Sequence, residues 1–316
     1  MSESRHVPLV IVGGGPAGLT SAIYGVRAGI ELELIEMGVP GGQVFIADKI
    51  ENYPGFPEPI SGPELSERMK KQAENLGVKF TVDRVKSVKL DGETKAISLD
   101  SGVELTCDAL IVATGSTPRK LGVKGEAKLW GRGVSYCASC DGAFFKDQRI
   151  AVVGGGDTAC QEAIMLSHLA SKVYVIHRRD QFRAQEYIVR CATSEPNLEV
   201  LWGSVLKSID GENGVEGVTV ENVKTGEQSK LEVEGVFIFI GMNPITDFVK
   251  GVVELTGEGY IKAGEDTRTS ATGVFAAGDV RTKPARQITT AVGDGANAVR
   301  AVEIYFIERG LSGRYV

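Results

Sequence analysis

Two segments of the chain share one order of pattern: an apolar run, a glycine turn, a helical pattern and a second apolar run. In the first, residues 8–36, Gly13, Gly15 and Gly18 have the spacing G-x-G-x-x-G. Glycines so placed between a strand and a helix let the backbone approach a pyrophosphate, which the helix N-terminus stabilises. Glu36 ends the second run, where a carboxylate can accept hydrogen bonds from a ribose. The segment predicts a dinucleotide-binding unit rather than a merely tight turn.

The second segment, residues 149–179, repeats this order. Its turn positions are Gly154, Gly156 and Ala159. His177 stands 18 residues after Ala159, just as Glu36 stands 18 residues after Gly18. Three arginines follow it, Arg178, Arg179 and Arg183. A carboxylate at this place would repel a ribose 2′-phosphate, whereas guanidinium groups bind one through charge-assisted hydrogen bonds. We therefore expect NADPH here and a dinucleotide with a free 2′-hydroxyl in the first unit; the alternative is a solvated basic helix start.

Further apolar runs end in glycine at 108–118, 236–244 and 273–280. The last ends in Gly278-Asp279 before a helical pattern, a position that leaves Asp279 free to hold a polyol hydroxyl. Interleaved strand and helix patterns predict an α/β protein with parallel sheets. The simplest organisation has two Rossmann-like three-layer dinucleotide-binding domains, the second inserted into the first. We expect the first domain to comprise 1–117 and 246–316, and the inserted domain to comprise 118–245.

Charge and composition exclude several classes of function. The formal net charge of −6 offers no electrostatic argument for a nucleic-acid partner. The chain has no run of about 20 apolar residues, so we expect no membrane span. The N-terminus lacks a signal-peptide pattern. Five cysteines are too few and odd in number for a secreted disulfide scaffold. We therefore expect a cytoplasmic protein without a membrane partner.

The stretch SYCASCDGAFF, residues 135–145, places Cys137 and Cys140 two residues apart and Asp141 directly after them. A zinc site would need four ligands, but the other cysteines are scattered singly and there are three histidines, so we expect no metal. A purely structural bridge would close a tiny loop and stabilise little. A redox dithiol is favoured, because a C-x-x-C pair closes reversibly and commonly has one thiol pKa lowered to about 7. Asp141 is the candidate general acid; the alternative is a helix-cap or turn aspartate.

These motifs together resemble those of the low-molecular-weight thioredoxin reductases, flavoproteins that use NADPH to reduce a disulfide. The resemblance covers nearly the whole chain. It rests on GGGPAGL, PGGQ, IENYPGF, ATGSTPR, CASCDGAFF, GGGDTA, HRRDQFRA, GDV and RQITTAVGDGANA. One departure is Gln161, where the family pattern has an acid; it falls in a predicted helix and leaves the phosphate turn intact.

The resemblance implies FAD in the first domain and NADPH in the inserted one. The FAD residues would be Gly13, Gly15, Gly18, Glu36, Gly42, Gln43, Asn52, Ala113, Gly115, Gly278, Asp279, Arg286 and Gln287. The NADPH residues would be Gly154, Gly156, Asp157, Thr158, Ala159, His177, Arg178, Arg179 and Arg183. The resemblance also implies a homodimer, with Cys140 facing the flavin and Cys137 attacking the acceptor.

The implied activity is thioredoxin-disulfide reduction, with thioredoxin or a thioredoxin-like protein as partner. An alternative is an NADPH-dependent flavoprotein reductase of another thioredoxin-like, glutaredoxin-like or peroxiredoxin-system acceptor. An oxygenase or oxidase has no need of the C-x-x-C pair, and a flavin sensor would have little use for a second nucleotide site. The larger glutathione-reductase type carries its cysteines near the first glycine motif, where this chain has none.

Overall fold

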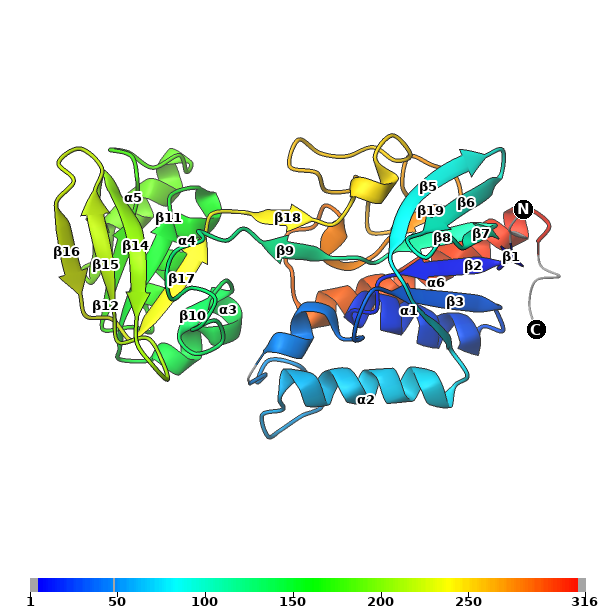
Figure 1. Ribbon diagram of the computed structural model, residues 1–316, viewed down its shortest axis with the longest axis horizontal. Helices are drawn as coiled ribbons and strands as arrows, with labels where there is room; N and C mark the ends of the chain where they lie inside the picture. Colours follow the sequence, from blue (N-terminus) through cyan, green and yellow to red (C-terminus); the bar gives the residue numbers. More distant parts are fainter. Residues whose placement is uncertain (1–4, 48, 312–316) are drawn as a thin grey trace. The chain divides into compact units, whose positions relative to one another are not determined.

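The computed structural model describes residues 5–47 and 49–311. The chain divides into two compact units (Figure 1). One unit combines the residues up to Thr117 with those from Asn243 onward, and the other is Pro118–Met242. The second unit is thus an insertion in the first. No helix within the described ranges is long and apolar enough to cross a membrane.

The chain passes between the units through two short strands. These are β9 (Ser116–Pro118) and β18 (Met242–Pro244), which pair in a two-stranded sheet. The return crossing lies between Met242 and Asn243, earlier in the chain than the expected 245–246.

The first unit is built on a five-stranded sheet in which every pairing is parallel. In spatial order its strands are β19 (Val274–Ala276), β8 (Ala109–Val112), β2 (Leu9–Val12), β3 (Leu32–Glu36) and β4 (Lys79–Val82). All residues of β2 and β8 are buried, as expected of parallel strands covered on both faces.

Alternate residues of β2 enter two different hydrophobic cores. Leu9 and Ile11 pack with three helices, α1 (Pro16–Arg27), α2 (Gly62–Asn75) and α6 (Ile288–Glu308). Val10 and Val12 pack with a four-stranded sheet on the opposite face. That sheet contains β1 (Arg5–His6), β7 (Glu104–Cys107), β6 (Thr94–Leu99) and β5 (Val85–Asp91). Three short 3-10 helices complete the unit: η1 (Gly42–Ile46), η3 (Asp247–Val249) and η4 (Gly278–Val280).

The second unit repeats this three-layer arrangement. Its parallel sheet contains β10 (Val134–Ser135), β17 (Gly235–Phe239), β11 (Arg149–Gly154), β12 (Lys172–Ile176) and β13 (Leu198–Leu201). One face packs on the antiparallel strands β14 (Ser204–Asp210), β15 (Gly217–Asn222) and β16 (Gln228–Leu231). The other face packs on α3 (Ala138–Asp141), η2 (Gly142–Phe145), α4 (Asp157–Ser167) and α5 (Glu186–Ser194). The predicted α/β class with two Rossmann-like units is confirmed.

Candidate active site

Cys137 and Cys140 are joined by a disulfide, with their Cα atoms 5.3 Å apart. Cys137 is the N-cap residue of the short helix α3, and Cys140 lies within that helix. Cys140 is exposed and Cys137 is half-buried. Neither redox cysteine is therefore enclosed in the core of the inserted unit.

Asp141 is held beside this bridge by Ser135, a residue that no sequence motif distinguishes. Ser135 lies on β10 and is buried. Its Oγ lies 2.5 Å from Asp141 Oδ2 and accepts a hydrogen bond of 3.1 Å from Cys137 N. Burial raises the pKa of the Asp141 carboxyl, and the hydrogen bond from Ser135 opposes this rise. A carboxyl that binds its proton more tightly than usual thus lies next to the disulfide.

The remaining cysteines are free thiols. Burial raises the thiol pKa of Cys107 to about 12 and that of Cys160 to about 11, so both remain protonated at neutral pH. Cys191 is half-buried on α5. Within residues 5–47 and 49–311, no cluster of histidine, cysteine and carboxylate side chains could hold a metal ion.

The first glycine turn connects β2 to α1 with close backbone contacts. Gly13 has φ +106°, and a Cβ there would lie 2.5 Å from the carbonyl oxygen of Ala113. A Cβ at Gly18 would lie 1.8 Å from the carbonyl oxygen of Gly13. Gly15 is the N-cap residue of α1, and no side chain caps the helix. The N–H groups at the start of α1 are therefore available to an anion.

Two other predicted residues adjoin this turn. Glu36, at the end of β3, accepts hydrogen bonds from Gly14 N at 2.6 Å and Gly38 N at 3.0 Å. Gly42 approaches the turn so closely that its Cβ would lie 3.2 Å from the Cα of Gly15. The next residue, Gln43, is exposed. The loop after β3 thus lies along the turn.

The chain after β19 meets the same helix. A Cβ at Gly278 would lie 2.9 Å from the Cβ of Ala17 in the first turn of α1. The adjacent Asp279 has a buried Oδ1 without a hydrogen-bond partner among the described residues, and burial raises its pKa. Such an atom needs a donor. Asp294 accepts a hydrogen bond of 2.9 Å from Gly278 N and so supports the turn, a role that the sequence did not reveal.

The other residues expected at this site come from three segments. Gln287 is the N-cap of α6, and its Oε1 lies 3.3 Å from Asn52 Nδ2. The Arg286 guanidinium lies over the Tyr260 ring at 4.3 Å, and its Nε is buried without a hydrogen-bond partner among the described residues. Gly115 has φ +68°, and its carbonyl accepts a hydrogen bond of 3.0 Å from Ile245 N.

The second glycine turn, between β11 and α4, repeats the features of the first. A Cβ at Gly154 would lie 2.6 Å from both the Cβ of Ala159 and the carbonyl oxygen of Phe239. Gly156 is the N-cap of α4 without a capping side chain, and space is open next to it. Asp157 and Thr158 follow on the exposed first turn of the helix.

The structure separates His177 from the arginines that follow it. His177 is buried, and its ring lies where a Cβ on Gly155 would be only 2.2 Å away. Its Nε2 lies 3.1 Å from Gln181 O, and burial lowers the pKa of the ring. His177 therefore supports the turn from the protein interior.

The three arginines are all exposed, and none forms an ion pair within the described ranges. They are Arg178, Arg179 and Arg183. Arg183 N donates a hydrogen bond of 2.8 Å to Gly155 O, which ties this segment to the glycine turn. Unpaired guanidinium groups beside a helix N-terminus form a site suited to phosphate.

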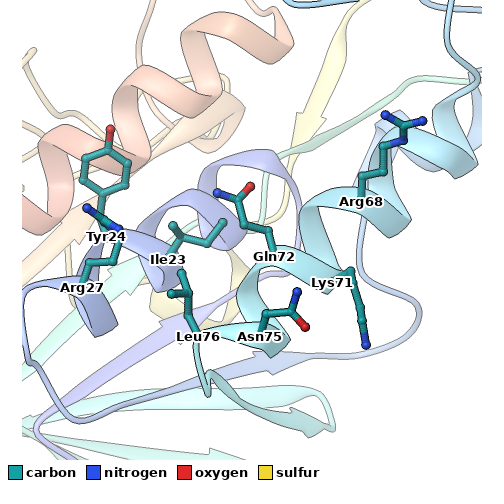
Figure 2. A pocket seen from close by; sticks show the side chains of 8 residues that line it. All are labelled: Ile23, Tyr24, Arg27, Arg68, Lys71, Gln72, Asn75 and Leu76. Carbon is teal, nitrogen blue, oxygen red and sulfur yellow. The ribbon is translucent and has the colours of Figure 1, made fainter.

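A surface pocket between α1 and α2 lies outside this set of residues (Figure 2). Its lining residues are Ile23, Tyr24, Arg27, Arg68, Lys71, Gln72, Asn75 and Leu76. Arg68 is already paired with Glu64 at 2.7 Å. None of the residues predicted for cofactor binding or catalysis lines the pocket.

Comparison with known proteins identifies the family. Residues 7–295 match the pyridine nucleotide-disulphide oxidoreductase family. The chain is 44% identical to a thioredoxin reductase of Bacillus subtilis, covering 98% of this chain and 97% of that one. It is 46% identical to a thioredoxin reductase of Streptomyces coelicolor, covering 94% and 92%. The crystal structure of thioredoxin reductase from Streptococcus pyogenes superimposes with a TM-score of 0.92 at 44% identity, covering 97% and 100%. The chain belongs to the pyridine nucleotide-disulphide oxidoreductases.

Proposed function

We propose that this protein is a thioredoxin-disulfide reductase, which passes electrons from NADPH through FAD and the Cys137–Cys140 disulfide to thioredoxin. The observation that carries the proposal is a disulfide with a half-buried carboxyl beside it, in a chain with two uncapped glycine turns. The relatives named as thioredoxin reductases match almost end to end, which supports the same activity here.

The first unit has the features required to hold FAD. Gly13 and Gly18 let the backbone of strand and helix pack closely, and Gly15 leaves room for a pyrophosphate at the uncapped start of α1. The buried oxygen of Asp279 lacks a donor that a cofactor hydroxyl would supply. The wider binding set is Glu36, Gly42, Gln43, Asn52, Ala113, Gly115, Gly278, Arg286 and Gln287. When bound, FAD supplies a carrier that accepts hydride from a nicotinamide and reduces a disulfide.

The second unit would hold NADPH. Its pyrophosphate would bind at the uncapped turn formed by Gly154, Gly156 and Ala159, beside Asp157 and Thr158. The exposed Arg178, Arg179 and Arg183 would bind the 2′-phosphate. His177 would support the site without contacting the phosphate, because its buried ring packs against Gly155 of the turn.

The dithiol would then reduce the acceptor by two exchanges. The Cys137 thiolate attacks one sulfur of the acceptor disulfide, forming a mixed disulfide and releasing the other acceptor sulfur as a thiolate. The Cys140 thiolate next attacks Cys137 Sγ, which closes the bridge and releases the second acceptor thiolate. Asp141 holds a proton next to these sulfurs and exchanges it as the thiolates form and disappear.

Reduction of thioredoxin by the purified, FAD-loaded protein with NADPH tests this function. Glutaredoxin-like and peroxiredoxin-system proteins serve as competing acceptors at equal concentration. A higher kcat/KM for thioredoxin supports the proposal, and a preference for another acceptor would replace the partner but keep the chemistry. We further propose that the protein is a cytoplasmic homodimer, as the family resemblance implies. Light scattering during size-exclusion chromatography measures the number of subunits.

A further inference from the structure

The hydroxyl of Ser135 connects the redox loop to its acid. Its Oγ lies 2.5 Å from Asp141 Oδ2, 3.1 Å from Cys137 N and 3.2 Å from Cys137 O. Ser135 is 3% exposed, so water does not compete for these contacts. One hydroxyl thus contacts the carboxyl and both backbone groups of the first redox cysteine.

A serine hydroxyl has one proton to donate and two lone pairs that accept. With Asp141 ionised, the Ser135 hydroxyl donates to the carboxylate and accepts from Cys137 N. With Asp141 protonated, the acid donates to Ser135 Oγ, and the serine proton turns to Cys137 O. Every hydrogen bond is satisfied in both states, without movement of a heavy atom.

We propose that Ser135 is a positioning residue for Asp141, which holds this carboxyl in one orientation in both protonation states by reversing one hydrogen bond. Asp141 can then take up and release a proton during disulfide exchange without rearrangement of the redox loop. The inference rests on the proposed function, because it gives Ser135 a part in the proton transfer of that reaction.

The surroundings of Asp141 leave Ser135 as its polar partner. Helix α4 packs against α3, and its titratable side chains are Asp157, Cys160 and Glu162. Within residues 5–47 and 49–311, burial raises the pKa of Asp141 and the hydrogen bond from Ser135 lowers it. Loss of the Ser135 hydroxyl should therefore change the pKa of the Asp141 carboxyl directly.

Titration of Asp141 tests the inference. The carboxyl carbon signal of ¹³C-aspartate-labelled oxidised holoenzyme is followed against pH, with Asp141→Asn identifying the signal. Because the hydroxyl stabilises the ionised form more strongly than the neutral form, Ser135→Ala should raise the Asp141 midpoint by about one to two pH units. Ser135→Thr keeps the hydroxyl and should remain close to the original midpoint. An unchanged midpoint in Ser135→Ala would overturn the inference.

A double-mutant comparison separates positioning from support of the fold. Ser135→Ala should lower thioredoxin turnover in the original protein but have little further effect in the Asp141→Asn background. An equal loss in both backgrounds would assign Ser135 a structural role only and overturn the inference. Failure of the original protein to reduce thioredoxin would instead refute the proposed function, while the carboxyl titration would still report on Ser135.

Discussion

Arg281 and Asp294 form an ion pair inside the first unit, with nitrogen–oxygen distances of 2.6 and 2.9 Å and both side chains 8% exposed. Lys283 adds a third contact to the same carboxylate, at 2.9 Å. Asp294 also accepts a hydrogen bond from Gly278 N, so one buried carboxylate pairs with two cations and holds the turn that carries Asp279. This makes Asp294 a support of the expected cofactor site.

Removing that carboxylate should destabilise the protein strongly. Asp294→Ala leaves two cations buried without their partner, and breaking such a pair typically costs about 3–5 kcal/mol. Urea denaturation at pH 7 measures the loss, and flavin absorbance per protein should fall with it. Glu303→Ala on the same helix is the control, because its pair with the exposed Arg300 is worth less than about 1 kcal/mol. Equal losses for the two variants would contradict the role given to Asp294.

Acid should weaken the protein through Glu33. Burial alone would raise the pKa of this carboxyl, but hydrogen bonds from Arg5 and Thr81 hold it at about 2, against 4.5 for the unperturbed group. A pKa lowered by folding contributes stability that is fully present above 4.5 and is lost as the pH falls toward 2. Glu33→Gln should therefore lower the urea midpoint at pH 7, and its difference from the original protein should narrow below pH 4.5. If the difference between the two urea midpoints stays constant down to pH 3, Glu33 is not the source of the acid sensitivity. The control is Glu74→Gln on α2, an exposed carboxylate whose replacement should leave the urea midpoint nearly unchanged at each pH.

The fold could be predicted where local pattern and required geometry agree. The residues of β2 and β8 are buried on both faces, so they read as uninterrupted apolar runs. Gly13 could be assigned to a turn because its positive φ and its contact with Ala113 exclude a side chain. The antiparallel strands were not predicted, although β6 alternates buried and partly exposed residues and a two-residue turn with Gly92 at φ +61° joins it to β5.

A candidate site could be proposed from the sequence only where residue type carries the chemistry. The C-x-x-C pair and the arginines after β12 are recognisable from spacing. Ser135 is not recognisable from spacing, because its role depends on how the chain folds back after it to bring Asp141 within hydrogen-bond distance. Likewise Asp294 meets Arg281 only through the packing of α6, and the HRR pattern does not show that His177 faces inward.

The close packing of strand and helix at the first turn should make Gly18 irreplaceable. A Cβ there would lie 1.8 Å from a backbone oxygen, which cannot move aside as a side chain can. Gly18→Ala should cost about 1–3 kcal/mol through overpacking and release flavin. Gly293→Ala is the matched control, because it lies within α6 with open space around it and should add up to about 1 kcal/mol of helix stability. Retention of flavin and an unchanged urea midpoint in Gly18→Ala would refute the packing argument.

The arginines after β12 should select NADPH over NADH. One hydrogen bond to a charged group is worth about 1.5–3 kcal/mol. Arg178→Ala or Arg179→Ala should therefore weaken the binding of NADPH about 10- to 100-fold. The KM for NADH should hardly change, because NADH lacks the phosphate. Lys230→Ala, an exposed charge removed from β16, controls for net charge. Equal losses for the two nucleotides would place these arginines on the pyrophosphate or in support of the fold.

The dithiol assignment makes the sharpest distinction between the steps of the reaction. Cys137→Ser and Cys140→Ser each leave one sulfur, so neither variant can close the bridge again after it reduces an acceptor. Thioredoxin turnover should be abolished in both, whereas FAD should remain bound and NADPH should still bleach it, since the glycine turns are unchanged. Stopped-flow absorbance measures the bleaching, and an acceptor assay on the same samples measures turnover. Cys191→Ala, with its thiol half-buried on α5, should turn over normally. Full turnover in either serine variant would mean that electrons reach the acceptor without this disulfide.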